Sequence, residues 1–398
     1  MTLFSNGCVD FLRRIRMLRR SSLILVVLAA LLVVSLVSVS AQDETLKISL
    51  VVNGVLGDKS FFDSAQRGMD MVMDEYEAEV NSIELGIDPQ NWETGLEDAM
   101  SDVDNYDILI AGTFQMIDYL AKNADKYPDK TFIFFDAPMP YDNAEVCVDG
   151  CKNVYSITYN QNEGSFLAGV YAAAMSAVAG DGKPEVVLGA VGGQDIPVIN
   201  DFIVGYEQGA CLVSADSKVL VQYAGSWNDP AKGKEIALAM YDQGADVIFQ
   251  VAGGTGVGVF EAAQEKSLFA IGVDSDQASI IQETDPEQAA RILTSMQKNV
   301  DASLFRAIGL YLEDALPVGE IEGLGLDTNG VSLSINDIYT AATPQSVQDL
   351  VAAATEAVIA GDISVITVFA DEASAAKVGQ GCAAMPAAEF DAASFLSQ

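Results

Sequence analysis

The chain has 398 residues, half of them apolar, which is enough to bury two hydrophobic cores. Its formal net charge of −36 makes nucleic acid and anionic lipid poor partners. It contains no histidine, which excludes Ser-His-Asp and Cys-His nucleophile pairs and zinc sites that use histidine.

The first segment has the order of a signal peptide. Five arginines within residues 13–20 precede an apolar run from Leu23 to Val39, and small residues then lead to a cleavage site after Ala41. Because the run approaches the length of a membrane span, an uncleaved anchor is the alternative. In both cases we expect the chain from residue 42 onward to lie outside the cytoplasm. Cys8 precedes the apolar run, which argues against the lipid anchor of a lipoprotein.

Short, nearly continuous apolar runs recur along the rest of the chain and predict buried strands. A helix over residues 61–76 follows the first strand, and further helical segments separate the later ones. Strands that alternate with helices predict parallel sheets with right-handed crossovers, here a doubly wound α/β plan used twice. The predicted strands are Leu46–Val52, Ile83–Gly86, Ile108–Ala111, Phe132–Phe135, Val154–Thr158, Val186–Ala190, Val219–Tyr223, Val247–Val251 and Leu268–Val273.

The order of these segments predicts two lobes joined by a three-segment hinge. The first lobe ends near 153–158, where a new helix starts at Glu163. The segment 292–296 and a helix that holds Lys298 are expected to return to the first sheet, and 331–335 to cross again. The predicted boundaries are 42–156 plus 278–332 for the N-terminal lobe, 157–277 plus 333–370 for the C-terminal lobe, and 371–398 for a helical extension.

Four cysteines follow the signal segment, and an even number in an exported chain favours disulfide bonds. Cys147 and Cys151 enclose three residues with Asp-Gly in the turn, which favours a local bridge and leaves Cys211 to pair with Cys382. Buried free thiols are the alternative for some of them.

Carboxylates follow several predicted strands, at the edge where ligands bind in open α/β sheets. Asp58 starts a helix after the first strand and could accept hydrogen bonds from sugar hydroxyls; alternatively, Asp58 or Ser60 only caps that helix. Asp274 directly follows a buried strand and is either at the ligand-binding edge or again a helix cap, while Asp136 is a further strand-tip carboxylate. No cluster of metal ligands accompanies them, so we expect no metal and no cofactor.

Aromatic side chains in strand-end loops are candidates for stacking on a planar ligand. Phe61, Phe114 beside Thr113, Trp227 and Phe260 occupy such loops or the helix starts after them, and the alternative for each is a place in the core. The glycine loop of Gly254, Thr255 and Gly256 would let the backbone approach a ligand closely.

Five motifs follow one another along the chain: Asp58-Lys59-Ser60-Phe61, Glu163–Gly169, Gly225–Glu235, Met240–Asp274 and Thr294–Asp301. Together they resemble the basic membrane protein family, the nucleoside-binding substrate-capture components of ABC importers. The resemblance implies a type I periplasmic-binding-protein fold, with Asp274 on ribose hydroxyls and Lys298 reaching the cleft. Phe62 stands where relatives usually have Asn, so a polar contact to the base would be missing.

We therefore expect a monomeric binding protein that is exported to the periplasm or the cell surface. Its expected ligand is a nucleoside, with purine nucleosides as the first candidates, and its expected partner is an ABC permease that receives the ligand. Riboflavin is the alternative ligand, and a nucleoside hydrolase using Asp58 and Asp274 is the alternative class of protein. The predicted ligand-binding residues are Asp58, Lys59, Ser60, Phe61, Thr113, Phe114, Asp136, Trp227, Gly254, Thr255, Gly256, Phe260, Asp274 and Lys298.

Overall fold

The structure is a computed structural model that describes residues 45–179, 185–386 and 389–397. The predicted signal peptide and its cleavage site lie outside these ranges. Within them, no helix combines the length and the apolar character that crossing a membrane requires.

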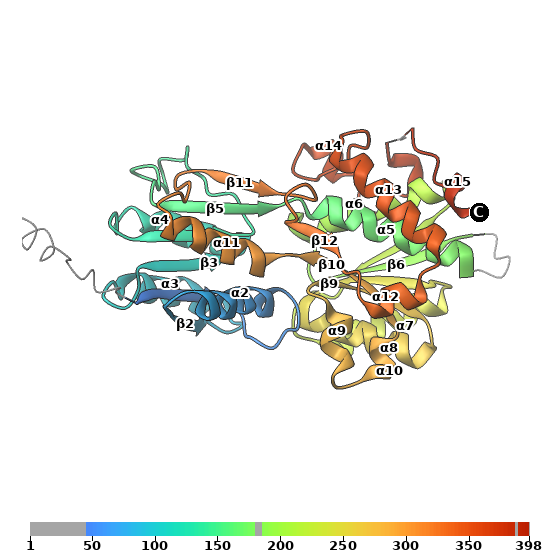
Figure 1. The fold of residues 1–398 in the computed structure, drawn as a ribbon, viewed down its shortest axis with the longest axis horizontal. Helices are drawn as coiled ribbons and strands as arrows, with labels where there is room; N and C mark the ends of the chain where they lie inside the picture. The colour runs from blue at the N-terminus through green and yellow to red at the C-terminus, as the bar shows by residue number, and fades with distance from the viewer. Residues whose placement is uncertain (1–44, 180–184, 387–388, 398) are drawn as a thin grey trace, which may run out of the picture. The chain divides into compact units, whose positions relative to one another are not determined.

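The first sheet has six parallel strands in the order β11-β5-β4-β3-β1-β2, and the elements around it form what we call the first lobe (Figure 1). Its strands are β1 (Leu46–Val52), β2 (Ala78–Glu84), β3 (Ile108–Gly112), β4 (Thr131–Phe135), β5 (Val154–Tyr159) and β11 (Ile321–Leu324). Its helices are α2 (Phe61–Glu75), η1 (Pro89–Asn91), α3 (Trp92–Ser101), η2 (Phe114–Met116), α4 (Ile117–Ala124) and α11 (Val300–Leu312).

The edge strand β2 begins at Ala78, earlier than the predicted strand at Ile83–Gly86. Its residues alternate between half-buried and exposed, because an edge strand has one partner and one wet side. It therefore lacks the continuous apolar run by which the buried strands were predicted.

The second sheet has the order β12-β10-β9-β8-β6-β7 and is parallel except for β12, which pairs with β10 in the antiparallel sense; the elements around it form the second lobe. Its strands are β6 (Val187–Gly192), β7 (Lys218–Tyr223), β8 (Val247–Val251), β9 (Phe269–Asp274), β10 (Ile292–Lys298) and β12 (Val331–Leu333). Its helices are α5 (Gln161–Ala179), α6 (Pro197–Val213), α7 (Pro230–Asp242), η3 (Gly253–Gly256), α8 (Val257–Lys266), α9 (Gln277–Gln282), α10 (Pro286–Ala289), α12 (Asp337–Ala342) and α13 (Gln345–Ile359).

The chain crosses between the sheets after β5, after β10 and between β11 and β12. The predicted return of residues 292–296 to the first sheet is wrong, because these residues form β10 beside β9. Lys298 accordingly ends a strand rather than lying in a helix, and the return comes only with α11, which packs on α2. Residues 331 and 332, expected in the first lobe, belong to β12 of the second sheet. An apolar run identifies a strand but not the sheet that it joins.

Helices α5 and α6 pack unusually closely, and glycines make this contact possible. A Cβ at Gly209 would lie 1.9 Å from the carbonyl oxygen of Phe166, and one at Gly169 would lie 2.0 Å from that of Tyr206. Larger residues would push the helices apart. Most of α5 is buried, which explains why its sequence shows no amphipathic stripe.

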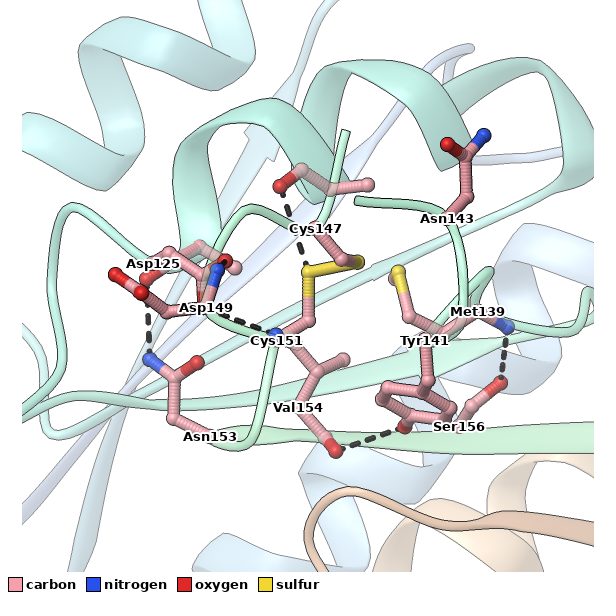
Figure 2. The surroundings of a disulfide bond; sticks show 12 residues. Asp125, Met139, Tyr141, Asn143, Cys147, Asp149, Cys151, Asn153, Val154 and Ser156 are labelled. Atoms are coloured by element: carbon pink, nitrogen blue, oxygen red, sulfur yellow. Dashed lines mark hydrogen bonds between the residues drawn. A yellow bond between two sulfur atoms is a disulfide. The ribbon is translucent and has the colours of Figure 1, made fainter. Parts of the chain in front are cut away.

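Cys147 and Cys151 form a disulfide bond that closes the loop before β5 (Figure 2). Both cysteines are buried, and the carboxylate of Asp125 accepts hydrogen bonds from the backbone N–H groups of Asp149 (2.8 Å) and Cys151 (2.9 Å). The bridge and this carboxylate together fix the turn, as the short spacing of the cysteines favoured.

Cys211 on α6 and Cys382 form the second disulfide bond, the pairing that the sequence left for them. It attaches the C-terminal segment to the second lobe, where Glu207 also accepts a 2.8 Å hydrogen bond from the backbone N–H of Gly379. The predicted helical extension is largely irregular instead. In the described residues of this segment, only short helices interrupt it: α14 (Glu372–Ala375), η4 (Cys382–Ala384) and α15 (Ala393–Leu396).

Candidate ligand-binding site

A cavity of about 220 Å³ lies between the two lobes, at the carboxyl ends of the strands of both sheets. This is the position at which open α/β sheets bind ligands. Its lining comprises Asn53, Gly54, Val55, Asp58, Phe61, Phe62, Ile87, Pro89, Trp92, Thr113, Phe114, Gln115, Asp136, Gln194, Ile196, Val198, Ile199, Phe202, Trp227, Asn228, Val251, Gly253, Gly254, Val273, Asp274 and Lys298.

Lys298 contributes a positively charged side chain to the cavity lining, and this side chain is almost wholly buried. Its Nζ donates a 2.5 Å hydrogen bond to Asp136, so that the second lobe supplies the ammonium and the first lobe the carboxylate. Three aromatic rings surround the same nitrogen, with centroids at 4.8 Å for Phe202 and 5.5 Å for Phe61 and Tyr159. Cation–π attraction and the ion pair together offset the loss of water around the ammonium.

Asp274 ends β9 and is buried beside this pair. Ser60 of the first lobe donates a 2.5 Å hydrogen bond to its Oδ2. Burial raises the pKa of Asp274 to about 6, although Lys298 and the Ser60 hydroxyl favour the charged form. The neighbouring carboxylates Asp58 and Asp136 add to the rise. A carboxylate with this little water around it gains from any ligand group that donates a hydrogen bond.

Asp58 caps the start of α2 and also lines the cavity. Its carboxylate accepts hydrogen bonds from the backbone N–H groups of Ser60 (2.9 Å), Phe62 (3.0 Å) and Asp63 (3.2 Å). Burial raises its pKa above the ordinary value, and these three donors oppose that rise. The capping interpretation therefore describes what the structure shows, while the carboxylate still faces the cavity.

Three strand-tip residues of the site adopt left-handed backbone conformations, which are uncommon for residues other than glycine. They are Thr113 after β3 (φ 74°), Asp136 after β4 (φ 69°) and Asp274 at the end of β9 (φ 63°). The surrounding hydrogen bonds hold these conformations. Thr113, for example, donates from its backbone N–H to Phe135 (3.0 Å) and from its hydroxyl to Asn53 (3.2 Å).

Of the predicted aromatic residues, Phe61, Phe114 and Trp227 line the cavity. The Trp227 ring lies against Gly193, where an added Cβ would come within 2.2 Å of it. Phe114 is 38% exposed. Phe260 does not line the cavity, because it is fully buried in the core of the second lobe beside Val259.

Four other predicted residues do not line the cavity. Thr255 is buried, and its hydroxyl accepts from the backbone of Asp229 (2.9 Å) and donates to that of Ser226 (2.9 Å). Gly256 packs against the side chain of Gln250, which leaves no room for a Cβ.

Lys59 and Ser60 join the lobes instead. Their backbone carbonyl oxygens accept hydrogen bonds from Gln277 (3.0 Å) and Ser275 (2.9 Å), respectively, which follow β9 in the second lobe. The motif that begins at Asp58 therefore serves both the cavity and the contact between lobes.

Part of the lining was not predicted from the sequence. Asn53 and Gln115 follow β1 and β3, and the Asn53 amide donates a 3.3 Å hydrogen bond to Gln115. The strand-end rule could have found both. Phe202 lies within α6, where its sequence carries no signal of a site. Ile87 directly follows the predicted strand Ile83–Gly86, but its aliphatic side chain gave no sign of ligand contact.

The arrangement suits binding through hydrogen bonds and stacking. Three carboxylates can accept from hydroxyl or N–H groups, one ammonium can donate, and aromatic rings offer planar faces. Among the described residues, no group of acidic or cysteine side chains is arranged to hold a metal ion.

The two lobes and the cleft between them define a type I periplasmic-binding-protein fold. A solute-binding protein of an ABC transporter system from Aeropyrum pernix matches with a TM-score of 0.74 at 25% identity, covering 85% of this chain and 99% of that one. A periplasmic solute-binding protein from Actinobacillus succinogenes with bound D-allose matches with a TM-score of 0.54 at 13% identity, covering 74% and 99%, which supports the fold alone.

The chain belongs to the PnrA-like family of ABC transporter substrate-binding proteins, whose model matches residues 45–362. It is 33% identical over 270 residues to the ABC transporter nucleoside-binding protein BmpA of Lactococcus lactis, covering 65% of this chain and 71% of that one. It is 31% identical over 287 residues to basic membrane protein A of Borreliella burgdorferi, covering 71% and 76%. This family consists of substrate-binding proteins rather than enzymes, which sets the hydrolase alternative aside.

Proposed function

We propose that the protein captures a nucleoside, with purine nucleosides as the first candidates, in the cavity between its lobes and delivers it to an ABC importer. The observation that carries the proposal is the combination, in one cavity, of Asp58, Asp136, Asp274 and Lys298 with the rings of Phe61 and Trp227. Ribose hydroxyls need acceptors and a donor, and a base needs flat apolar faces.

The buried state of the charged residues supports the same proposal. Burial removes water from the Asp274 carboxylate and raises its pKa, and a ribose hydroxyl would replace a hydrogen bond that the carboxylate loses on leaving bulk water. The name of the Lactococcus lactis relative, a nucleoside-binding protein, points the same way. We further propose that the protein is exported, since delivery to the permease of an importer requires a position outside the cytoplasm. We also propose that it acts as a monomer.

A thermal-shift screen tests the ligand class, because a ligand that binds only the folded state raises the melting temperature. We expect adenosine, guanosine and inosine to raise it, and riboflavin and D-ribose to have little effect. Replacing Asp274 by Ala should remove the shift, whereas replacing the exposed Asp74 on α2 by Asn should not. A shift with riboflavin or a free sugar and none with any nucleoside would overturn the proposal.

A further inference from the structure

The cavity changes character from one end to the other along the first sheet. Asp136 follows β4, whereas Ile87 and Trp92 follow the edge strand β2. In the order β4-β3-β1-β2 these positions are three strand spacings apart, or roughly 14 Å. The first lobe thus offers a carboxylate at one end and apolar side chains at the other.

The second lobe is likewise charged at one end of the cavity and apolar at the other. Lys298 and Asp274 end the neighbouring strands β10 and β9, while Ile196 and Trp227 follow β6 and β7 at the far side of the sheet. The Lys298–Asp136 ion pair brings the charged ends of the two lobes together. Amides are present too: Gln194 and Asn228 of the second lobe line the apolar end.

We call the lining formed by Val55, Phe62, Ile87, Pro89 and Trp92 the apolar compartment. It comes from two adjacent segments of the first lobe, the loop after β1 with the start of α2 and the loop after β2 with η1 and the start of α3. The backbone N–H of Gly86 donates a 3.0 Å hydrogen bond to Gly54, which joins these loops. The Phe62 ring lies against Gly54, where an added Cβ would come within 2.3 Å of it.

The side chains of this compartment provide no polar group for a ligand. The indole N–H of Trp92 is already used, since it donates a 2.8 Å hydrogen bond to the backbone of Gly86. Ile87 is 61% exposed although it lines the cavity. Large apolar side chains left open beside a binding cavity mark surface that a ligand covers.

We propose that the preferred ligand carries an apolar substituent on its base, and that this substituent fills the apolar compartment. The inference rests on the proposed function, because the ribose is taken to lie at the charged end. In a purine nucleoside the C6 edge of the base points away from the ribose, and hence toward the compartment. A bare amino group among these five side chains would lose hydrogen bonds to water and find no acceptor in them, whereas an apolar group gains by leaving water.

Calorimetry with adenosine and N6-benzyladenosine tests this inference on the purified full-length protein. We expect the benzyl derivative to bind at least about tenfold more tightly, as burial of an aromatic ring implies. Phe62→Asn and Ile87→Asn should each reduce this preference severalfold. Ile335→Asn is the matched control, since Ile335 is 71% exposed and does not line the cavity.

The outcomes distinguish a failure of the apolar-substituent proposal from a failure of the proposed nucleoside-binding function. If adenosine binds and the benzyl derivative binds equally or more weakly, the inference is wrong and the proposed function stands. If no nucleoside binds, both fail. Because Ile87 is exposed, its variant should keep the melting temperature of the unmodified protein, so an unchanged preference in a folded Ile87→Asn protein would also count against the compartment.

Discussion

Lys298 at the end of β10 donates a 2.5 Å hydrogen bond to Asp136 at the end of β4, and this ion pair joins the two lobes at the charged end of the cavity. Their side chains are only 2% and 10% exposed. An ion pair buried to this degree contributes little net stability, but removing one partner leaves an uncompensated charge.

Replacing Lys298 by Met should lower the free energy of unfolding by about 3–5 kcal/mol, because Asp136 then stays buried without its partner. The double variant Lys298→Met, Asp136→Asn should recover much of this loss, since it removes both charges. Urea denaturation of the three proteins measures the effect. A loss below about 1 kcal/mol in the single variant would show that the pair is solvated like a surface ion pair.

The buried carboxyl of Asp274 should make stability depend on pH. Its pKa is raised to about 6 by burial, so the folded chain holds this proton more tightly than the unfolded chain does. The resulting stabilisation is complete below about pH 4 and is lost as the pH rises through about 6. From about pH 4 to pH 7, the unfolding free energy should therefore fall by about 2 kcal/mol more in the unmodified protein than in Asp274→Asn. Parallel pH profiles of the two proteins would argue against the raised pKa.

Trp227 should stack on the base of the ligand. Replacing it by Ala should weaken nucleoside binding by about 1–3 kcal/mol, the range for stacking of bases on aromatic side chains. The fold should stay intact, because the ring is only partly buried, whereas loss of a core Trp would destabilise by about 3–5 kcal/mol.

Fluorescence provides a direct signal for this contact. The chain has two tryptophans, and Trp92 also lines the cavity, so Trp92→Phe isolates the emission of Trp227. We expect that emission to change on addition of nucleoside. Unchanged affinity in a well-folded Trp227→Ala protein would transfer the stacking role to Phe61 and Phe114.

The rule that ligands bind at the carboxyl ends of parallel strands explains what the sequence could predict of this site. It located Asp58, Asp136 and Asp274, because each follows a buried strand that its own apolar run reveals. The same rule also selected Thr255 and Phe260, which the structure uses for a loop contact and for the core. Sequence position fixes the strand end but not the direction of a side chain.

The parts that could not be predicted depend on contacts between distant segments. The local sequence of residues 292–298 does not indicate whether this strand extends the first or the second sheet. Its place in the second sheet is what brings Lys298 to Asp136. The apolar compartment was missed for another reason: Ile87 directly follows the predicted strand Ile83–Gly86, but an aliphatic side chain at a strand end carries no signal of ligand contact.

The two disulfide bonds should differ in their contribution to stability. Cys211 and Cys382 are separated by 171 residues, but Cys147 and Cys151 by only 4. In the chain-entropy model, a cross-link that closes the longer loop restricts the unfolded chain more, by about 3 kcal/mol. Replacing each pair by Ala and comparing urea denaturation under non-reducing conditions measures this. Equal losses would mean that strain or residual structure outweighs the loop length.

The proposed function requires that the protein bind a nucleoside and leave it chemically unchanged. Titration calorimetry with adenosine, guanosine and inosine, followed by chromatography of the recovered ligand, measures both properties. We predict one saturable site, intact nucleoside after incubation, and binding weakened by about 1.5–3 kcal/mol in Asp274→Ala, the range for hydrogen bonds to charged groups. Absence of binding heat with every nucleoside, or release of free base, would contradict the account.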